Sequence, residues 1–199
     1  MKVGDFREKS IGLLILAGGK SGRMGREKST LLLGDKTFSQ HIGEAMGEYN
    51  ERLFSTNGAE VPAGFLGVAD DPDLKWNGPA AGIISALEVC KSEWLMVVPC
   101  DAPNVDYKVC EELWNVASCL EKPAPILAAN SGGIEPLIAL YPKAVCDIMR
   151  QRLTNGTRKV LDVIADTGYV LVPMDDKKLV NINWPKDYMA GDRSIRTWQ

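Results

Sequence analysis

The feature that most constrains the fold of this chain is the apolar run Ile11–Ala17, which ends directly at Gly18 and Gly19. A short apolar run bounded by glycines is typical of a β-strand buried on both faces. Such a strand needs other structural layers on each side, because both rows of its side chains must be kept from water. We therefore expect a sheet that is covered by helices on both faces.

Alternating strand and helix patterns follow along the rest of the chain. Strands are predicted over residues 52–56, 66–69, 94–98, 126–129, 137–141 and 169–173. Helices are predicted over residues 37–46, 79–90, 106–120, 143–152 and 159–166. This alternation predicts a three-layer α/β/α fold with a mainly parallel central sheet. A length of 199 residues suits a single domain over residues 1–199.

Two loops of such a sheet are the first candidates for a functional site. In an open parallel sheet, ligands bind beyond the carboxyl ends of the strands. This rule selects the loop after Ala17 and the loop after Val98. The first loop contains glycines and basic side chains, and the second contains a carboxylate.

Composition and charge narrow the function classes. The formal net charge of −3 argues against a general nucleic-acid-binding protein, which usually has a basic surface. No apolar run is long enough to span a membrane, and the start of the chain lacks the pattern of a secretory signal. The five cysteines form no CxxC pair and are odd in number, which disfavours a disulfide framework or a structural zinc site. We expect a cytoplasmic protein with reduced thiols.

The first loop has the composition of a phosphate-binding loop. Residues 16–28 read LAGGKSGRMGREK, with four glycines and the basic side chains Lys20, Arg23, Arg26 and Lys28. Glycines allow backbone N–H groups to converge on phosphate oxygens, and the cations offset phosphate charge. The loop has neither the GxxxxGK[ST] pattern of a P-loop nor the GxGxxG pattern of dinucleotide-binding folds. A solvated basic surface loop is the alternative interpretation.

The second loop supplies a carboxylate. Residues 99–103 read PCDAP and place Asp101 directly after a predicted buried strand. Magnesium is often held by one or two carboxylates together with substrate phosphates, so Asp101 is a candidate metal ligand. Asp101 could equally cap the following helix or close a turn, and the residues alone leave both interpretations open.

The two loops together resemble those of a known family. LAGGKSGRMGREK is similar to the LAGGxSxRMGxDK pattern of the molybdenum cofactor guanylyltransferases, with Glu27 in place of the usual aspartate. CDAP at residues 100–103 resembles the family's metal-binding CDxP motif, and GPAAG at residues 78–82 resembles its GPLAG segment. Residues 135–141 and 181–185 resemble the family's PLxALY strand and NINTP segment.

The resemblance implies a GT-A-like, Rossmann-like nucleotidyltransferase and roles for particular residues. It implies catalytic roles for Lys28, Arg23 and Asp101, with a Mg²⁺ ion bound at Asp101. It also implies nucleotide-binding roles for a longer set: Leu16, Ala17, Gly18, Gly19, Lys28, Asn57, Asp71, Gly78, Gly82 and Asn183. Asn57 and Asn183 could instead form turns with their neighbours.

Other members of this set also compete with simple structural roles. Asp71 has Asp70 beside it, so the acidic nucleotide contact could fall on either residue. A carboxylate there could accept hydrogen bonds from guanine N1 and N2 or from ribose hydroxyls, or the acidic run could be a solvated turn. Gly78 and Gly82 could serve only a tight junction between a loop and a helix.

The implied reaction is the transfer of GMP from GTP to molybdopterin with release of pyrophosphate. The implied partners are GTP, molybdopterin and molybdoenzyme maturation proteins, without nucleic acid or a membrane. A cytidylyl- or sugar-phosphate nucleotidyltransferase is an alternative of the same fold, and a non-catalytic guanine-nucleotide or cofactor delivery partner is an alternative from another class. A Rossmann-type oxidoreductase is disfavoured because the GxGxxG pattern is absent.

Overall fold

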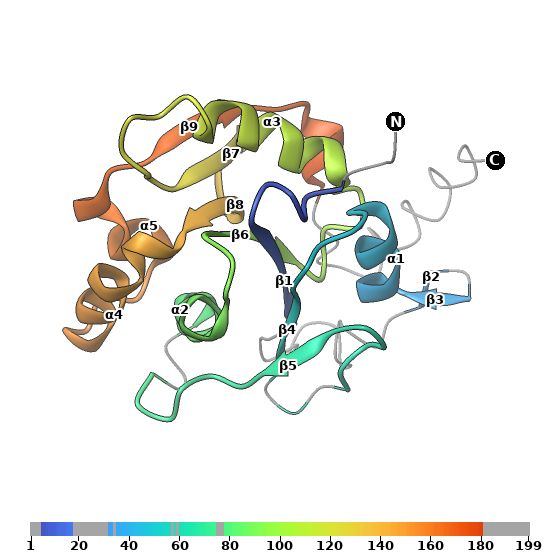
Figure 1. Ribbon diagram of the computed structural model, residues 1–199, viewed down its shortest axis with the longest axis horizontal. Coiled ribbons are helices and arrows are strands. Elements are labelled where there is room, and N and C mark those ends of the chain that lie inside the picture. Colours follow the sequence, from blue (N-terminus) through green and yellow to red (C-terminus); the bar gives the residue numbers. More distant parts are fainter. Residues whose placement is uncertain are drawn as a thin grey trace.

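The computed structural model describes residues 5–17, 32–33, 35–56, 58, 60–74 and 78–180. Its centre is a seven-stranded sheet with the strand order β5-β4-β1-β6-β8-β7-β9 (Figure 1). The strands are β1 (Ile11–Ala17), β4 (Arg52–Thr56), β5 (Leu66–Val68), β6 (Trp94–Pro99), β7 (Ile126–Asn130), β8 (Gly133–Pro142) and β9 (Val170–Pro173). A separate antiparallel pair is formed by β2 (Leu32–Leu33) and β3 (Lys36–Thr37).

Helices cover both faces of this sheet (Figure 1). The helices are α1 (Phe38–Ala45), α2 (Pro79–Val89), α3 (Tyr107–Ala117), α4 (Cys146–Thr154) and α5 (Val160–Val163). Short 3₁₀ turns span Lys143–Val145, Ala165–Thr167 and Asp176–Leu179. α1 and α3 pack on one face of the sheet, and α2, α4 and α5 pack on the other. The predicted three-layer α/β/α fold is confirmed.

β1 is a buried interior strand, as its apolar sequence predicts. All seven of its residues are buried, and it pairs in parallel with β4 on one side and β6 on the other. Leu13 and Ile15 belong to the core under α1 and α3, whereas Leu14 and Leu16 belong to the core under α2. The alternation of side chains along a strand therefore supplies both halves of the core.

The sheet is mainly parallel, as predicted, and β8 is the exception among the described strands. β8 pairs antiparallel with both β6 and β7, whereas β7 and β9 pair in parallel. The reason is the connection between β7 and β8, which contains only Ser131 and Gly132. A two-residue connection can join only antiparallel neighbours, because parallel strands need a crossover of about a dozen residues or more.

Local sequence signals explain where the helices begin. The Thr37 side chain accepts a hydrogen bond from the backbone N–H of Gln40, and the Gln40 side chain accepts one from the backbone of Thr37, so α1 starts with a capping box. The Asp106 side chain accepts from the backbone N–H groups of Lys108 and Val109 at the start of α3.

α2 differs from the one-sided helix that its sequence suggests. The apolar residues Ile83, Ile84 and Leu87 predict one buried face, but all residues from Ala80 to Leu87 are buried. The cause is that α4 and α5 pack against α2 in the layer that the three helices share on this face of the sheet. A helix that is apolar on all sides is stable only when it is enclosed in this way. Within the described ranges, no helix has the length and apolarity needed to cross a bilayer.

Candidate active site

The strand order places a topological switch point between β1 and β6. From β1 the chain moves outward to β4 and then to β5, and it returns to the other side of β1 to form β6. Ligands of open α/β sheets bind at such a point, outside the carboxyl ends of the two strands. The two loops selected from the sequence leave the sheet on either side of this point.

The carboxyl ends of β1 and β6 are joined by a hydrogen bond. The backbone N–H of Cys100 donates to the carbonyl oxygen of Leu16 at 3.0 Å, and Leu16 pairs with Pro99 in the sheet register. The chain therefore leaves β1 at Ala17 next to the turn that contains Asp101. The predicted loop residues Gly18, Gly19, Arg23 and Lys28 lie outside the described residues.

Asp101 lies in a turn at this edge of the sheet. The backbone N–H of Ala102 donates to the carbonyl of Pro99 at 3.2 Å, which closes the turn around Cys100 and Asp101. Asp101 is partly exposed there. It does not cap the following helix, because Asp106 is the N-cap of α3. Of the roles open from the sequence, the turn is present and the helix cap is excluded.

The carboxylate of Asp101 also fits the chemistry of a magnesium site. Magnesium binds hard oxygen ligands and commonly takes only one or two carboxylates when phosphate oxygens complete its shell. No group of three or more histidine, cysteine, aspartate or glutamate residues suited to a metal occurs in the described part of the chain. Asp101 can supply the one carboxylate that such a site needs.

The other side of the switch point is formed by β4 and the segment after β5. Thr56 at the end of β4 pairs with Ala17, while the predicted site residue Asn57 lies outside the described residues. The segment after β5 contains Asp70 and Asp71. The other predicted asparagine, Asn183, also lies outside the described residues.

Asp71 is held by contacts within the protein. Its backbone N–H donates to Ser85 Oγ at 2.9 Å, and its Oδ1 accepts from the backbone N–H of Asp73 at 2.8 Å. Its Oδ2 forms an ion pair with Arg150 of α4. The hydrogen bond from Asp73 and the one from Arg150 lower the pKa of Asp71 below its usual range. Arg150 lies 79 residues from Asp71 in the sequence, and no local pattern pointed to it.

The two glycines of the GPAAG segment have different structural requirements. Gly78 has a φ of 74° at the N-cap of α2, a conformation that favours glycine. Gly82 lies where a Cβ atom would come within 2.8 Å of Ser55 Oγ and 3.2 Å of Leu16 Cδ2. Gly82 therefore lets α2 approach the ends of β1 and β4 closely.

A third group at the same edge was not predicted from the sequence. The turn between β7 and β8 is held by Asp176, which accepts from the backbone N–H of Ser131 at 2.9 Å and from its hydroxyl at 2.5 Å. Asn104, in the segment after Asp101, donates through its side chain to the carbonyl of Lys177 at 3.0 Å. These contacts fasten the last described turn of the chain to the β6 side of the site.

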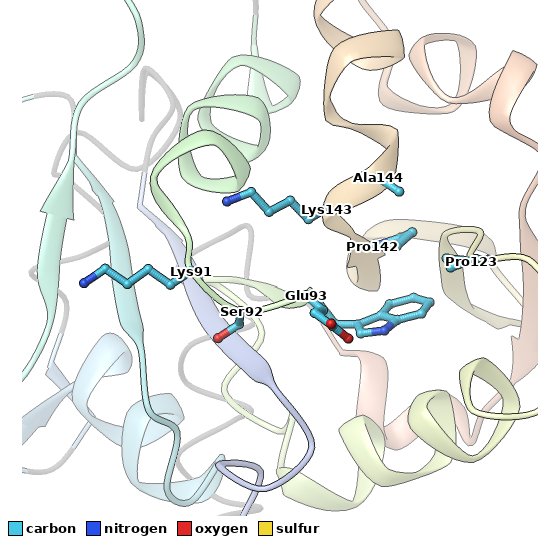
Figure 2. A pocket seen from close by; sticks show the side chains of 8 residues that line it. Lys91, Ser92, Glu93, Pro123, Pro142, Lys143 and Ala144 are labelled. Carbon is cyan, nitrogen blue, oxygen red and sulfur yellow. The ribbon is translucent and has the colours of Figure 1, made fainter.

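A cavity of about 340 Å³ lies at the opposite edge of the sheet (Figure 2). It is lined by Lys91, Ser92, Glu93, Trp94, Pro123, Pro142, Lys143 and Ala144. Trp94 begins β6, and Pro142 ends the antiparallel strand β8, so this cavity is at the amino ends of the parallel strands. It contains none of the predicted site residues.

The cysteines and the histidine give no sign of a nucleophilic site. All five cysteines are free, and burial raises the pKa of Cys110 to about 12 and that of Cys90 to about 11. Such thiols are poor nucleophiles, because the thiolate is the reactive form. His41, the single histidine of the sequence, lies within the amphipathic helix α1.

Comparisons with known proteins agree with this fold. Residues 13–168 match the family model of the MobA-like NTP transferase domain. A molybdenum cofactor guanylyltransferase of Pseudomonas paraeruginosa is 30% identical and is aligned over 87% of this chain and 90% of its own length. A probable molybdenum cofactor guanylyltransferase of Bacillus cereus is 27% identical, with 92% of this chain and 96% of the relative covered.

Solved structures share the fold. Molybdopterin-guanine dinucleotide biosynthesis protein A of Archaeoglobus fulgidus superposes with a TM-score of 0.74 at 22% identity, over 93% of this chain and 98% of the other. 2-C-methyl-D-erythritol 4-phosphate cytidylyltransferase of Thermus thermophilus superposes with a TM-score of 0.71 at 16% identity, over 99% and 100% of the two chains. The family match covers most of the sequence and includes both loops at the switch point, and the chain therefore belongs to the MobA-like NTP transferase family of nucleotidyltransferases.

Proposed function

We propose that this protein transfers GMP from GTP to molybdopterin, forming the guanine dinucleotide form of the cofactor and releasing pyrophosphate. The observation that carries the proposal is the hydrogen bond between Cys100 and Leu16, which holds the start of the LAGG loop and the Asp101 turn side by side. The names of the relatives, among them one at 30% identity, support guanylyl transfer over other nucleotidyl transfers.

In this reaction the protein mainly positions the two substrates and compensates the charge of their phosphates. A phosphate oxygen of molybdopterin attacks the α-phosphorus of GTP, the bond to the bridging oxygen breaks, and pyrophosphate leaves with that electron pair. The attacking phosphate is already ionised at neutral pH, so no general base is needed.

The residues of the first loop suit the charge compensation. Backbone N–H groups at Gly18 and Gly19 would bind phosphate oxygens, and Lys28 and Arg23 would offset the charge that develops on the transferred and leaving groups. Preorganised donors of this kind contribute most when they are fixed before the reaction.

A Mg²⁺ ion would be held by Asp101 together with phosphate oxygens of the nucleotide. When bound, it supplies positive charge that makes the triphosphate a better electrophile and pyrophosphate a better leaving group. Asp101 contributes by presenting its carboxylate from a closed turn at the switch point.

The nucleotide would be bound by residues from both sides of β1. These are Leu16, Ala17, Asn57, Gly78, Gly82, Asn183 and one residue of the pair Asp70 and Asp71. We further propose that residues 1–199 form one domain and that the protein acts in the cytoplasm, where reduced cysteines are stable. Its other partners would be molybdopterin and the proteins that mature molybdoenzymes.

The test is incubation of the purified protein with molybdopterin, Mg²⁺ and GTP, followed by identification of the product by mass spectrometry and measurement of pyrophosphate. We expect the guanine dinucleotide and pyrophosphate in equal amounts. Parallel reactions with CTP, ATP and UTP control for the base. Formation of product with CTP but not with GTP would show that the nucleotide substrate is CTP. Binding of GTP without release of pyrophosphate would indicate a delivery protein.

A further inference from the structure

Strand β8 departs from the regular sheet register near its amino end. Its pairing with β7 passes from Leu127 opposite Ala139 directly to Ala128 opposite Glu135. One step along β7 therefore corresponds to four steps along β8, and residues 136–138 are the excess. Extra residues of this kind form a β-bulge, which bends the strand and changes the direction of its side chains. Residues 136–138 are called here the β8 bulge.

Tyr141 closes the β8 bulge. Its side chain is completely buried in the core under α2, and its hydroxyl donates to the carbonyl of Pro136 at 2.7 Å. In a regular strand these two residues would lie about 17 Å apart, at about 3.4 Å per residue, which is beyond the reach of a tyrosine side chain. The contact therefore exists because the bulge shortens the strand. It also holds the bulge in this shape, since a buried tyrosine hydroxyl needs a partner.

The β8 bulge separates β8 from β6 at the carboxyl edge of the sheet. The pairing of β8 with β6 ends at Val97 and Ala139, although β6 continues to Pro99, which pairs with Leu16 of β1. In the register of the described strands, the end of β6 is therefore paired with β1 alone. The Asp101 turn begins at Pro99, so it lies where β6 and β8 part.

The strand order gives the Asp101 turn two different neighbours (Figure 1). On one side is β1, which is followed in the sequence by the glycines of the proposed phosphate-binding loop. On the other side is β8 with its bulge. In phosphoryl transfer the attacking and leaving oxygens lie roughly in line on opposite sides of the phosphorus. Because pyrophosphate would leave on the β1 side, we expect the attacking phosphate to approach from the β8 side.

The side chains of the β8 bulge suit a flat organic ring. Pro136 and Leu137 are apolar and partly exposed, whereas Ile138 is buried. Leu137 packs against the core under α2, which gives the exposed part of the bulge a firm base. Small-molecule sites are lined mainly by apolar side chains, with a few polar groups that set the orientation of the ligand. A pterin ring has a flat face of the kind that such a surface can bind.

We infer that the β8 bulge receives the acceptor substrate beside Asp101, and that Tyr141 is a positioning residue that fixes the bulge through Pro136. The inference rests on the proposed function, because it assigns the acceptor side of the same reaction. The acceptor is a pterin that carries a phosphate monoester. Its ring would pack on Pro136 and Leu137, with its phosphate toward the Asp101 turn. Tyr141 would act from the core without touching either substrate.

Tyr141→Phe tests the positioning role, because it removes the hydroxyl and keeps the buried ring. We expect KM for molybdopterin to rise about tenfold, the usual effect of one lost hydrogen bond. KM for GTP and the calorimetric Kd for GTP should change little. Tyr169→Phe, the same change at an exposed tyrosine, is the matched control. An equal rise in both KM values, or an unchanged KM for molybdopterin, would overturn the positioning role.

Photo-crosslinking tests the location of the acceptor with Tyr141 intact, so it decides the question even if Tyr141→Phe folds poorly. The full chain with p-benzoylphenylalanine in place of Leu137 is irradiated with molybdopterin under anaerobic conditions. We expect a covalent adduct by mass spectrometry, and none when the probe replaces the exposed Leu171 of β9. Lost product formation with retained GTP binding would also support the location, because the probe then blocks the acceptor. An active variant without an adduct, or equal adducts at both positions, would overturn it.

The wild-type protein separates this inference from the proposed function. If it forms no guanine dinucleotide from GTP and molybdopterin, the proposed function fails and the inference fails with it. If it forms this product and the variants at Tyr141 and Leu137 show no selective effect on molybdopterin, only the inference is wrong.

Discussion

The two edges of the central sheet use polar side chains differently. At the amino edge, Glu51 accepts hydrogen bonds from the backbone N–H groups of Lys91 and Ser92 at 2.7 and 2.6 Å and from the Ser92 hydroxyl at 2.5 Å. Lys143 beside the cavity of Figure 2 donates to the carbonyl of Cys90. These hydrogen bonds join the residue before β4 and the 3₁₀ turn after β8 to the segment between α2 and β6.

The carboxyl edge is organised around the topological switch point between β1 and β6. There the sheet brings together the end of β1, the Asp101 turn and the start of α2, with Gly82 keeping the helix close to the strands. The polar network at the amino edge is closed within the chain and stabilises the fold, whereas we expect the residues gathered at the switch point to serve a bound ligand. Substitutions at the two edges should therefore separate stability from activity.

Lys28→Ala should give the largest effect. We expect kcat/KM for GTP to fall by about 10³-fold, because an electrostatic partner of the reacting phosphates is lost. Tm should stay unchanged if Lys28 serves only the ligand. The measurement is steady-state pyrophosphate release together with a thermal melt, with Lys20→Ala as the matched control in the same loop. Near-normal activity would remove Lys28 from the mechanism.

Asp101→Asn should come next, with a fall of about 10²-fold in activity at saturating GTP. The amide keeps the shape of the turn but is a weaker ligand for Mg²⁺, so the Mg²⁺ concentration needed for half-maximal rate should rise. A magnesium titration of the wild-type and variant proteins measures this. Asp106→Asn, at the cap of α3, is the comparison variant, and an equal response of both variants to Mg²⁺ would argue against Asp101 as the metal ligand.

Gly82→Ala should lower both stability and activity. Gly82 lies at the carboxyl edge of the sheet, but its neighbours Ser55 and Leu16 belong to the packed interior. The new methyl group would lie 2.8 Å from Ser55 Oγ, and overpacking of this kind costs about 1–3 kcal/mol. We expect a lower Tm and a higher KM for GTP. Adding Ser55→Ala removes the closest contact and should restore part of both losses. A double variant no better than Gly82→Ala would contradict the packing explanation.

Glu51→Gln should give the smallest kinetic effect and a loss of stability of about 1 kcal/mol. Partial burial opposes ionisation of Glu51, but hydrogen bonds from Ser92, Lys91 and Cys90 outweigh it and lower its pKa. Because the folded-state pKa is below the unfolded one, this stabilisation is present above the unfolded value of about 4.3 and is lost as pH falls through the folded value.

Thermal melts of wild type and Glu51→Gln from pH 7 to pH 3 check this prediction. The difference in Tm should be constant near neutral pH and should shrink at acid pH. KM for GTP should be the same in both proteins. A raised KM would mean that the two edges are coupled and would weaken the comparison on which these predictions depend.

Much of the fold could be predicted from local sequence. The run Ile11–Ala17 is a buried interior strand, and the predicted range 52–56 is the observed strand Arg52–Thr56. Thr37 and Asp106 cap their helices through side-chain bonds to residues two or three positions away. These predictions succeed because strand periodicity, burial and helix capping depend on neighbours within a few residues.

The two loops of the candidate site could be predicted from the sequence, but their positions relative to each other could not. The sequence shows that glycines and Asp101 each follow a strand, yet which strands are neighbours follows only from the strand order. The direction of β8 and the enclosure of α2 by α4 were likewise outside the reach of local patterns.

The sequence by itself determined the layers, the burial of the strand Ile11–Ala17, and the residue types at two strand ends. Only the tertiary structure decided that Leu16 and Cys100 share a hydrogen bond and that Arg150 reaches Asp71. The physical reason is that these contacts join residues tens of positions apart. Their formation depends on how whole elements pack against each other, which no local periodicity records.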